Sequence, residues 1–366
     1  MRIIKLIWLG FALASLLCGG CSQQSTSNAP QEWDFNAQKV WEISQIDGAQ
    51  LARPAEPRVA DDGTLYVHDF EQHVSYIIGA DGTIRGSFAP RGENESEVPF
   101  YLNCFPAGEQ VVVCAPDKLH FFTNQGQFVK AVPNNLFVRF PLAFKNENEC
   151  WLAPGALGDS PDGVAAVTCI NFATGEEKNI YTFDLTGDET KPTGGAVVVG
   201  LTPQAKMGYD RKADRIYFGK NTDTLLYCSG SGDDTIETIS IDGVRTPISE
   251  EVKRKYFADL GIPEEHVAAI VGNLPEKMAC YNTIQIIDGL VYIISAHEIS
   301  RTLPGLFVNV YSPSGQHLYY GEVHVEEGWH LASPDNLQFG SGCVYAVQEN
   351  DAGNKKIVKY TIKSCT

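Results

Sequence analysis

The feature of this sequence that most constrains its fold is a phrase in which tight turns flank short apolar runs. In "VADDGTLYVHDFEQHVSYIIGADGTIRGSF", residues 59–88, a turn at Asp62-Gly63 precedes one run and a turn at Asp81-Gly82 follows the next. Gly and Asp tolerate the positive φ angles of tight hairpins, and short runs rich in Val, Ile and Tyr suit strands covered on both faces. The phrase therefore predicts an antiparallel meander.

The first turn of this phrase returns along the chain at intervals of roughly 40 to 75 residues, which is the signature of a repeat architecture. The returns are Asp62-Gly63, Gly108-Glu109, Glu147-Asn148, Ala213-Asp214, Asp288-Gly289 and Ser341-Gly342. The sixth unit is short, while the strand-like residues 39–44 stand alone ahead of the first unit. Pairing these residues with 356–362 would leave no open sheet edge. We therefore expect an all-β fold over residues 35–366: a six-bladed β-propeller of four-stranded antiparallel blades, closed by the N-terminal strand.

Residues 58–100 resemble an NHL repeat. They carry Asp62-Gly63, the strand Tyr66-Val67-His68-Asp69, the turn Asp81-Gly82, and Gly92 where that motif has them. The whole chain is similar to the TolB-like and NHL-like six-bladed propeller lipoproteins of Bacteroides-type bacteria. The motif fades after Lys130, and beyond that point the resemblance rests on the turn spacing. It implies a propeller fold and an envelope location.

One segment departs from the strand pattern and predicts a small helical insertion, residues 244–278, between the fourth and fifth blades. Ser249 precedes Glu250 and Glu251, apolar residues follow at helical spacing, and Pro263 opens a second stretch of the same kind. An N-cap serine, early acids and the helical period agree on two short helices. The insertion is interpreted either as a lid sealing the ring or as a mobile functional cap.

The N-terminus predicts export. Basic residues, an apolar run of about 15 residues and Gly19-Gly20 precede Cys21, which is the order of a cleaved signal peptide at residues 1–20. A membrane-spanning helix needs about 20 apolar residues. Gly-Gly-Cys resembles the lipobox of bacterial lipoproteins, so we expect lipidation of Cys21, a flexible tether over residues 21–34, and an anchor in the outer membrane. Plain secretion is the alternative. The neutral residues after Cys21 favour the periplasmic side, and surface exposure stays open.

Charge excludes some partners. The formal net charge is −17, which disfavours binding to nucleic acid or to anionic lipid through charge alone. Eight cysteines follow Cys21 in a compartment where disulfides persist. The predicted hairpins place three pairs across from each other: Cys104–Cys114, Cys150–Cys169 and Cys343–Cys365. The alternative is that these are small buried thiols filling strand positions.

The expected functional surface is one face of the propeller, called here the long-loop face, where rigid strands carry variable loops. Its loops are residues 89–99, 132–139, 154–162, 184–203, 297–305 and 324–335. The candidate binding residues on it are Arg91, Arg139, Arg301 and Trp329. The stretch "HVEEGWH", residues 324–330, is the most suggestive, but it lacks zinc-motif spacing. We predict no metal and no cofactor, and no nucleophile elbow, P-loop or Rossmann fingerprint occurs in the sequence.

These observations favour a non-catalytic cell-envelope lipoprotein, a binding or scaffold module that engages a protein, peptide or glycan through the long-loop face. The alternative is a propeller lyase or hydrolase that uses His297, Glu298, His324 and His330. A third possibility is a purely structural platform within a larger envelope complex. A fold by itself decides among these only weakly.

Overall fold

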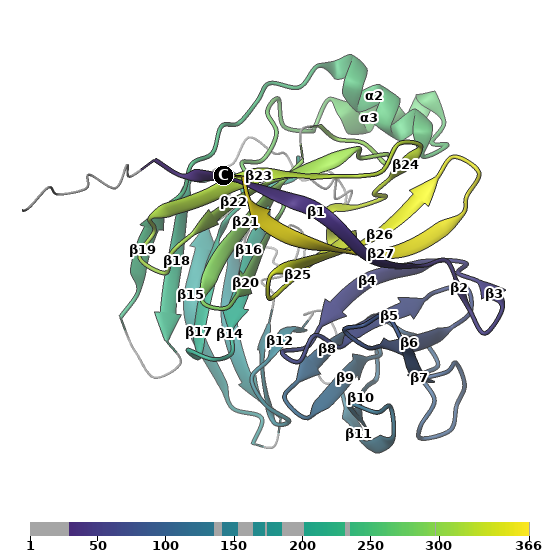
Figure 1. The fold of residues 1–366 in the computed structure, drawn as a ribbon. Coiled ribbons are helices and arrows are strands. Elements are labelled where there is room, and N and C mark those ends of the chain that lie inside the picture. The colour runs from purple at the N-terminus through teal and green to yellow at the C-terminus, as the bar shows by residue number, and fades with distance from the viewer. Residues whose placement is uncertain are drawn as a thin grey trace, which may run out of the picture. The chain divides into compact units, whose positions relative to one another are not determined.

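A computed structural model describes residues 29–134, 141–152, 164–172, 174–184, 201–230, 235–296 and 298–365. The fold is all-β, with mostly antiparallel sheets in a propeller-like ring and few helices (Figure 1). All of the elements named below belong to one unit of the chain, Gln31–Thr366. Among the described residues, no helix has the length and apolar character that a membrane crossing needs.

Four separate sheets are meanders of four strands that follow one another in sequence. They are β4 (Pro54–Val59), β5 (Leu65–Asp69), β6 (Val74–Ile78) and β7 (Ile84–Phe88); β8 (Asn103–Ala107), β9 (Gln110–Cys114), β10 (Lys118–Thr123) and β11 (Phe128–Pro133); β12 (Pro141–Phe144), β13 (Glu149–Leu152), β14 (Val164–Asn171) and β15 (Glu177–Asp184); and β16 (Ala205–Asp210), β17 (Arg215–Lys220), β18 (Leu225–Gly230) and β19 (Glu237–Ser240). The predicted turns lie between these strands. Gly63 and Gly82 have φ of 81° and 86°, the left-handed region that glycine adopts without strain.

The remaining long strands form one nine-stranded sheet instead of two blades of four. It contains β20 (Thr283–Ile287), β21 (Leu290–Ser295), β22 (Gly305–Tyr311), β23 (His317–His324), β1 (Gln31–Ile43), β27 (Lys355–Ser364), β26 (Cys343–Asn350), β24 (Trp329–His330) and β25 (Leu337–Gly340). The sheet count differs from the prediction because β1 bonds on both sides. It pairs in parallel with β23 at Gln31 and Glu32, and antiparallel with β27 over most of its length. A short hairpin, β2 (Gln45–Ile46) and β3 (Ala49–Gln50), follows.

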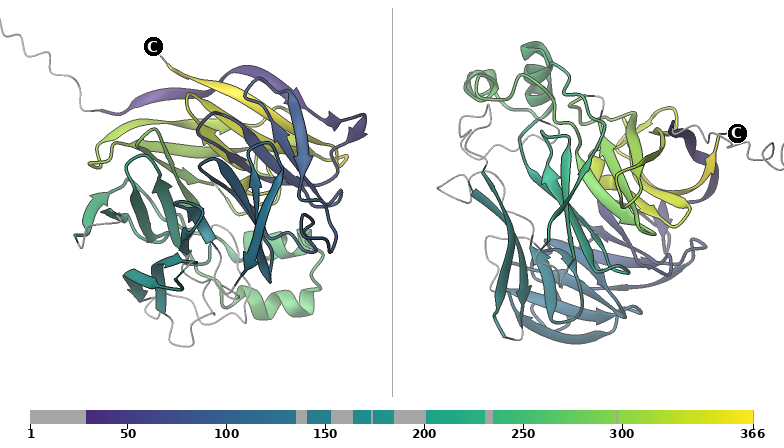
Figure 2. Two further views of the ribbon diagram at one scale, coloured as in Figure 1. Left: turned by 90° about the horizontal axis from the view of Figure 1, so that it is seen from below. Right: turned by 90° about the vertical axis from the view of Figure 1, so that its left-hand side faces the viewer.

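The predicted pairing of the N-terminal strand with the last strand is confirmed. β1 runs beside β27 (Figures 1 and 2). Lys39 lies opposite Tyr360, and Ile43 lies opposite Ile357. The strand begins at Gln31, inside the segment 21–34 that was expected to be a tether. Trp41 of this strand also donates a hydrogen bond from Nε1 to the carbonyl of Ala80, at 3.1 Å, in the turn between β6 and β7. The start of the chain is therefore attached to both the last strand and the first meander.

Neighbouring sheets are held together through their first strands and through apolar clusters. In turn, β4 contacts β8, β8 contacts β12, β12 contacts β16, β16 contacts β20, β20 contacts β25, and β25 contacts β4. Each pair of neighbours shares a buried cluster, such as Phe88 and Phe122 between the first two sheets, whose ring centroids are 5.2 Å apart. Aromatic pairs at this distance contribute about 1 kcal/mol beyond their burial.

The predicted pair of helices lies between β19 and β20, as α2 (Glu250–Asp259) and α3 (Glu264–Val271). The hydroxyl of Ser249 accepts a hydrogen bond from the backbone N–H of Val252, at 3.3 Å, and so caps α2 as expected. The helices have a small core of their own, which joins Phe257 and Val267 to Leu201 and Ile299 of the long-loop face. The insertion is thereby packed onto that face.

The structure does not form the three predicted disulfides, and strand register explains two of them. Cys104 lies opposite Val113, one residue from Cys114, so the two thiols point to opposite faces of their sheet. Cys150 lies opposite Ile170, and Cys169 lies opposite Trp151, which gives the same one-residue offset. In the third pair, Cys343 lies opposite Thr361, and Cys365 follows the end of β27. None of the eight cysteines in the described part of the chain forms a disulfide, and because Cys365 is exposed, the alternative of small buried thiols filling strand positions does not hold for every pair.

Candidate functional site

The long-loop face carries a pocket of about 100 Å³ beside the helical insertion. It is built by Asn282, which directly precedes β20, and by three segments: the insertion, the β21–β22 loop, and the segment from β24 to the start of the 3₁₀ helix η1 (Pro334–Asn336). The lining residues are Tyr256, Asn282, Ala296, Glu298, Ile299, Ser300, Leu303, Ala332, Ser333 and Pro334. The pocket therefore joins an apolar wall to a small set of polar side chains, a usual composition for small-molecule sites.

Asn282 is the buried polar residue of the pocket, with 4% of its surface exposed. Its backbone N–H donates to the carbonyl of Ile294, and its Oδ1 accepts from the backbone N–H of Ala296, both at 2.7 Å. These bonds fix the orientation of the side-chain amide. Its Nδ2 has no hydrogen-bond partner among the described residues. A buried donor left unpaired costs about 1–3 kcal/mol, so the amide is a strong candidate for contact with a ligand.

The aromatic part of the pocket comes from the helical insertion. Tyr256 lies on α2 beside Phe257, which is buried in the insertion core. Burial raises the pKa of Tyr256, and the positive charge of Arg301 opposes that rise, which places Arg301 near the tyrosine. The predicted binding residue Arg301 is thus found beside the pocket, on an exposed loop.

Two serines and one acid complete the polar lining. Ser333 Oγ accepts a hydrogen bond from the backbone N–H of Asp335, at 3.2 Å, and caps η1. Ser300 Oγ lies 3.1 Å from Thr302 Oγ1 and accepts from the Thr302 backbone N–H. Glu298 is exposed at the wall of the pocket. The serine oxygens are thus occupied as acceptors, and the carboxylate supplies a free acceptor.

A second group of ionisable residues lies on the first strands, and one of these strands, β4, contacts η1. Glu56 interrupts the pairing of β4 with φ of 53°, a left-handed conformation that costs a non-glycine residue energy. Its Oε2 is buried without a partner in the described chain, and so is Nε of Arg58. Burial raises the pKa of Glu56, and the nearby Arg58 opposes the rise. Burial likewise lowers the pKa of Lys206 on β16.

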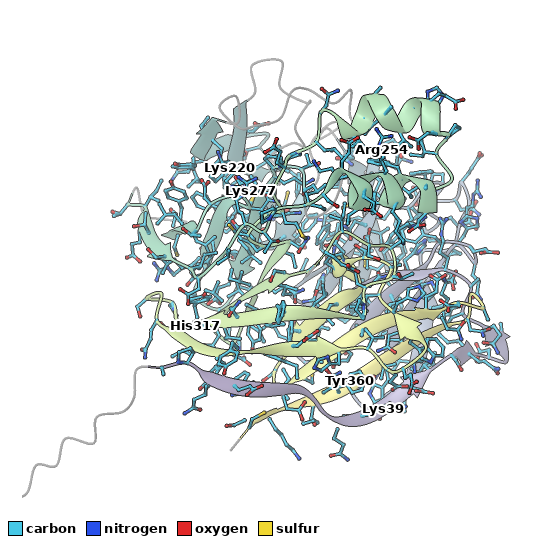
Figure 3. The ribbon with its side chains drawn as sticks, turned by 90° about the horizontal axis from the view of Figure 1, so that it is seen from above. Lys39, Lys220, Arg254, Lys277, His317 and Tyr360 are labelled. Carbon is cyan, nitrogen blue, oxygen red and sulfur yellow. The ribbon has the colours of Figure 1, made fainter. Side chains whose placement is uncertain are left out.

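The stretch "HVEEGWH" takes part in contacts that hold strands together. Its Glu326 binds Lys356 at 2.6 Å and Lys39 at 3.1 Å, and accepts from the hydroxyl of Tyr360 at 3.0 Å. Figure 3 labels Lys39 and Tyr360, which lie on the paired strands β1 and β27. The ammonium group of Lys356 also lies 4.1 Å from the ring centroid of Trp329, and a cation at this distance is attracted to the face of the aromatic ring. We call these residues the strand clasp, because they tie β1, β27 and the 324–330 segment together.

The other predicted site residues are scattered. Arg91 lies 3.1 Å from His73 through its guanidinium, on an exposed loop. Nδ1 of His324 lies 3.6 Å from Glu322, and its backbone N–H donates to Asn36. His330 pairs with Glu349 as part of β24. Within the described chain, neither histidine forms a hydrogen bond or an ion pair with Glu298. Arg139, His297 and Cys21 lie outside the described residues.

A search of the described residues finds no group of three or more His, Cys, Asp or Glu side chains that could hold a metal ion. A second hollow, of about 170 Å³, is lined by Lys145, Glu149 and Trp151 among others. Lys145 lies 3.5 Å from Asp214 and 3.9 Å from Glu149. The charges at that hollow therefore compensate one another, whereas the amide of Asn282 is left without a partner.

No family model matches the sequence, and no curated protein matches it. Solved structures do match its fold. A member of the DUF4221 family from Bacteroides vulgatus superposes with a TM-score of 0.57 at 12% sequence identity, over 92% of this chain and 100% of that one. A Bacteroides fragilis protein named as exported gives a TM-score of 0.52 at 9% identity, over 92% and 99%. A Xanthomonas campestris gluconolactonase gives 0.46 at 12% identity, over 91% and 95%. Identities this low show only the fold, a β-propeller arrangement.

The pocket lies on the long-loop face, but its main residues were not predicted from the sequence. Tyr256 was assigned to the helix period only, and Asn282 and Ser333 were not singled out. The sequence shows a polar residue between Tyr281 and the apolar run of β20, which is the available signal for Asn282. The orientation of the Asn282 amide is set by the hydrogen bond to its Oδ1. The donor of that bond is the backbone N–H of Ala296, just after the end of β21, and the sequence around Asn282 does not specify it.

Proposed function

We propose that residues 35–366 form a six-bladed β-propeller, whose fifth blade is β20–β23 and whose sixth is β25, β26 and β27 completed by β1. Support comes from the contacts between first strands, which run from β4 through five further strands and return to β4. The hydroxyl of Tyr345 on β26 also donates to the carbonyl of Gly63 in the first meander, at 3.3 Å. In this proposal the nine-stranded sheet is two blades joined by β1. The kinship with NHL and TolB-like propellers stays a prediction.

We propose that the protein is exported, acylated at Cys21 and held at the outer membrane, facing the periplasm. The signal-like residues 1–20 and Gly-Gly-Cys support this. Mass spectrometry of the mature N-terminus tests it. We expect a diacyl or triacyl modification on Cys21, and its loss in Cys21→Ser. An unmodified cysteine at that position, or a secreted wild-type protein, would contradict the anchor.

We further propose that the protein is a non-catalytic binding module of the envelope, and that its ligand, a protein, peptide or glycan, contacts the long-loop face at the Asn282 pocket. The observation that carries this is the fixed, buried amide of Asn282, whose Nδ2 has no partner in the described chain and which lines a pocket between three segments. Binding sites combine such preorganised polar groups with apolar walls. The alternative lyase or hydrolase has less support: of the members of its proposed set that the structure describes, Glu298 lines the pocket, whereas His324 and His330 do not.

Capture from detergent-solubilised envelope tests the binding role. Ala332→Trp would fill the pocket, and Ala352→Trp, on the exposed β26–β27 turn, is the matched control. We expect wild type and Ala352→Trp to retain the same envelope component, and Ala332→Trp to lose it. Equal capture by all three would exclude the pocket. Absence of any captured component, together with turnover of a defined substrate, would favour the enzyme.

A further inference from the structure

The polar groups of the Asn282 pocket present a mixture of donors and acceptors. Asn282 Nδ2 is a donor without a partner in the described chain. Ser333 Oγ already accepts from the backbone of Asp335, so its O–H is left to donate. Glu298 supplies a carboxylate acceptor on the same wall. A ligand group that both accepts and donates, as an aliphatic hydroxyl does, satisfies all three.

The charges beside the pocket argue against an ionic ligand. The carboxylate of Glu298 and the net charge of −17 repel an anion. An ammonium group would suit Glu298, but it has no acceptor to offer Asn282 or Ser333, and both donors would stay unpaired. Arg301 near Tyr256 weakens the attraction for a cation further. A neutral ligand is therefore favoured.

The apolar wall and the size of the pocket narrow the ligand class. Tyr256, Ile299 and Pro334 line it beside the polar groups. A sugar ring has an apolar C–H face and hydroxyls at its edge, which is the division that the pocket shows. The volume of about 100 Å³ is smaller than the roughly 150 Å³ of an engineered cavity that holds a whole benzene ring, and it admits the hydroxyl-bearing edge of one sugar ring.

We infer that the Asn282 pocket binds the neutral, terminal sugar residue of a glycan, edge first, through hydroxyl groups that accept from Asn282 and Ser333 and donate to Glu298. This inference rests on the proposed binding function and names its ligand class. Tyr256 and Pro334 pack against the ring, and the remainder of the glycan extends over the long-loop face.

The inference is tested by titrating the full mature protein with methyl glucoside, methyl galactoside and methyl mannoside, with binding followed by saturation-transfer NMR. Asn282→Asp is the sharp variant, because it keeps Oδ1 for Ala296 and replaces the Nδ2 donor. We expect binding of at least one glycoside, weakened about 10-fold or more by Asn282→Asp, since a buried hydrogen bond is replaced by opposed acceptors. Glu298→Gln should weaken it several-fold.

The matched control is Asn350→Asp on the β26–β27 turn, where Oδ1 accepts from the backbone of Ala352 and Asn354. It should leave glycoside binding unchanged, and circular dichroism melting of each variant shows that it is folded. Propylammonium and acetate are the ionic probes. No binding of any glycoside, equal binding by Asn282→Asp, or tighter binding of an ionic probe would each overturn the inference. If envelope capture depends on the pocket but no glycoside binds, the sugar inference is wrong and the proposed binding function is retained. If neither capture nor glycoside binding is observed, both proposals are wrong.

Discussion

The fold changes the pKa of two partly buried carboxyl groups, Glu326 of the strand clasp and Glu56 on β4, in opposite directions. Burial disfavours the ionised form of Glu326, but hydrogen bonds from Lys356, Lys39 and Tyr360 outweigh it and lower its pKa to about 2. Glu56 has an oxygen without a partner in the described chain, and burial raises its pKa. The clasp is therefore a stabilising ion network, whereas the burial of Glu56 lowers the free energy of unfolding. Costs of this kind gather at functional positions.

Removing the clasp carboxylate gives the largest expected effect. The Lys356 side chain is 3% exposed, and Glu326→Ala would leave its ammonium with Glu42 at 3.5 Å and the Trp329 ring. Loss of one partner from such a buried pair costs on the order of 3 kcal/mol. Urea unfolding at neutral pH measures it. The control Glu250→Ala removes an exposed helical pair with Arg254 and should cost about 0.5 kcal/mol or less. Equal losses would show that the clasp is no stronger than a surface pair.

The stability that Glu326 supplies should depend on pH in a defined direction. Its pKa is lower in the folded state than the ordinary 4.5, so its contribution is complete above 4.5 and is lost as pH falls towards 2. Glu326→Gln should therefore be less stable than wild type near neutral pH, by about 2 kcal/mol once the exposure of a third of the side chain is allowed for. The two proteins should converge near pH 2. A difference that is constant with pH would contradict the ionic origin.

Glu56 should behave with the opposite sign. A carboxyl group whose pKa is raised by folding contributes stability below its ordinary pKa of 4.5, and this is lost as pH rises through the folded value. Glu56→Gln should match wild type in acid and gain stability relative to wild type at neutral pH. The same urea titration, repeated from acid to neutral pH, measures this gain. A loss of stability at neutral pH would mean that the ionised carboxylate has partners after all, and the contrast with Glu326 would fail.

The two regions also differ in how far the sequence predicted them. The strand at residues 39–44 was expected to pair with 356–362 because both lacked partners, and this local pattern led to the correct pairing. The ions of the clasp were not predicted, since Lys39, Glu326 and Lys356 are distant in sequence and meet through the closing strand. The one unusual feature of Glu56 in the sequence is that this charged residue lies between Pro54 and Pro57. Its burial depends on neighbouring sheets, which no single segment specifies.

The disulfide predictions failed on a finer scale, because hairpin spacing gives neighbouring strands but not the parity of the register. A one-residue offset puts Cys104 and Cys114 on opposite faces, and hydrophobic patterning cannot reveal it where both faces are buried. Parity is set by where the turn begins. Asn103 pairs with Cys114 and Ala107 with Gln110, around the turn at Gly108.

The smallest expected effect is a difference in reactivity between two thiols, one in each of the two regions. Burial raises the pKa of Cys104, near Glu56, to about 11, whereas Cys365 lies exposed after β27, near the N-terminal end of β1. In the native protein Cys365 should react fast with Ellman's reagent and Cys104 should not, because thiolates are the reactive form. Cys365→Ser should remove the fast phase. In denaturant, the eight thiols beyond Cys21 should react equally with and without prior reductant. A thiol count that rises after reduction would show that the protein contains a disulfide, which would contradict the strand register described above.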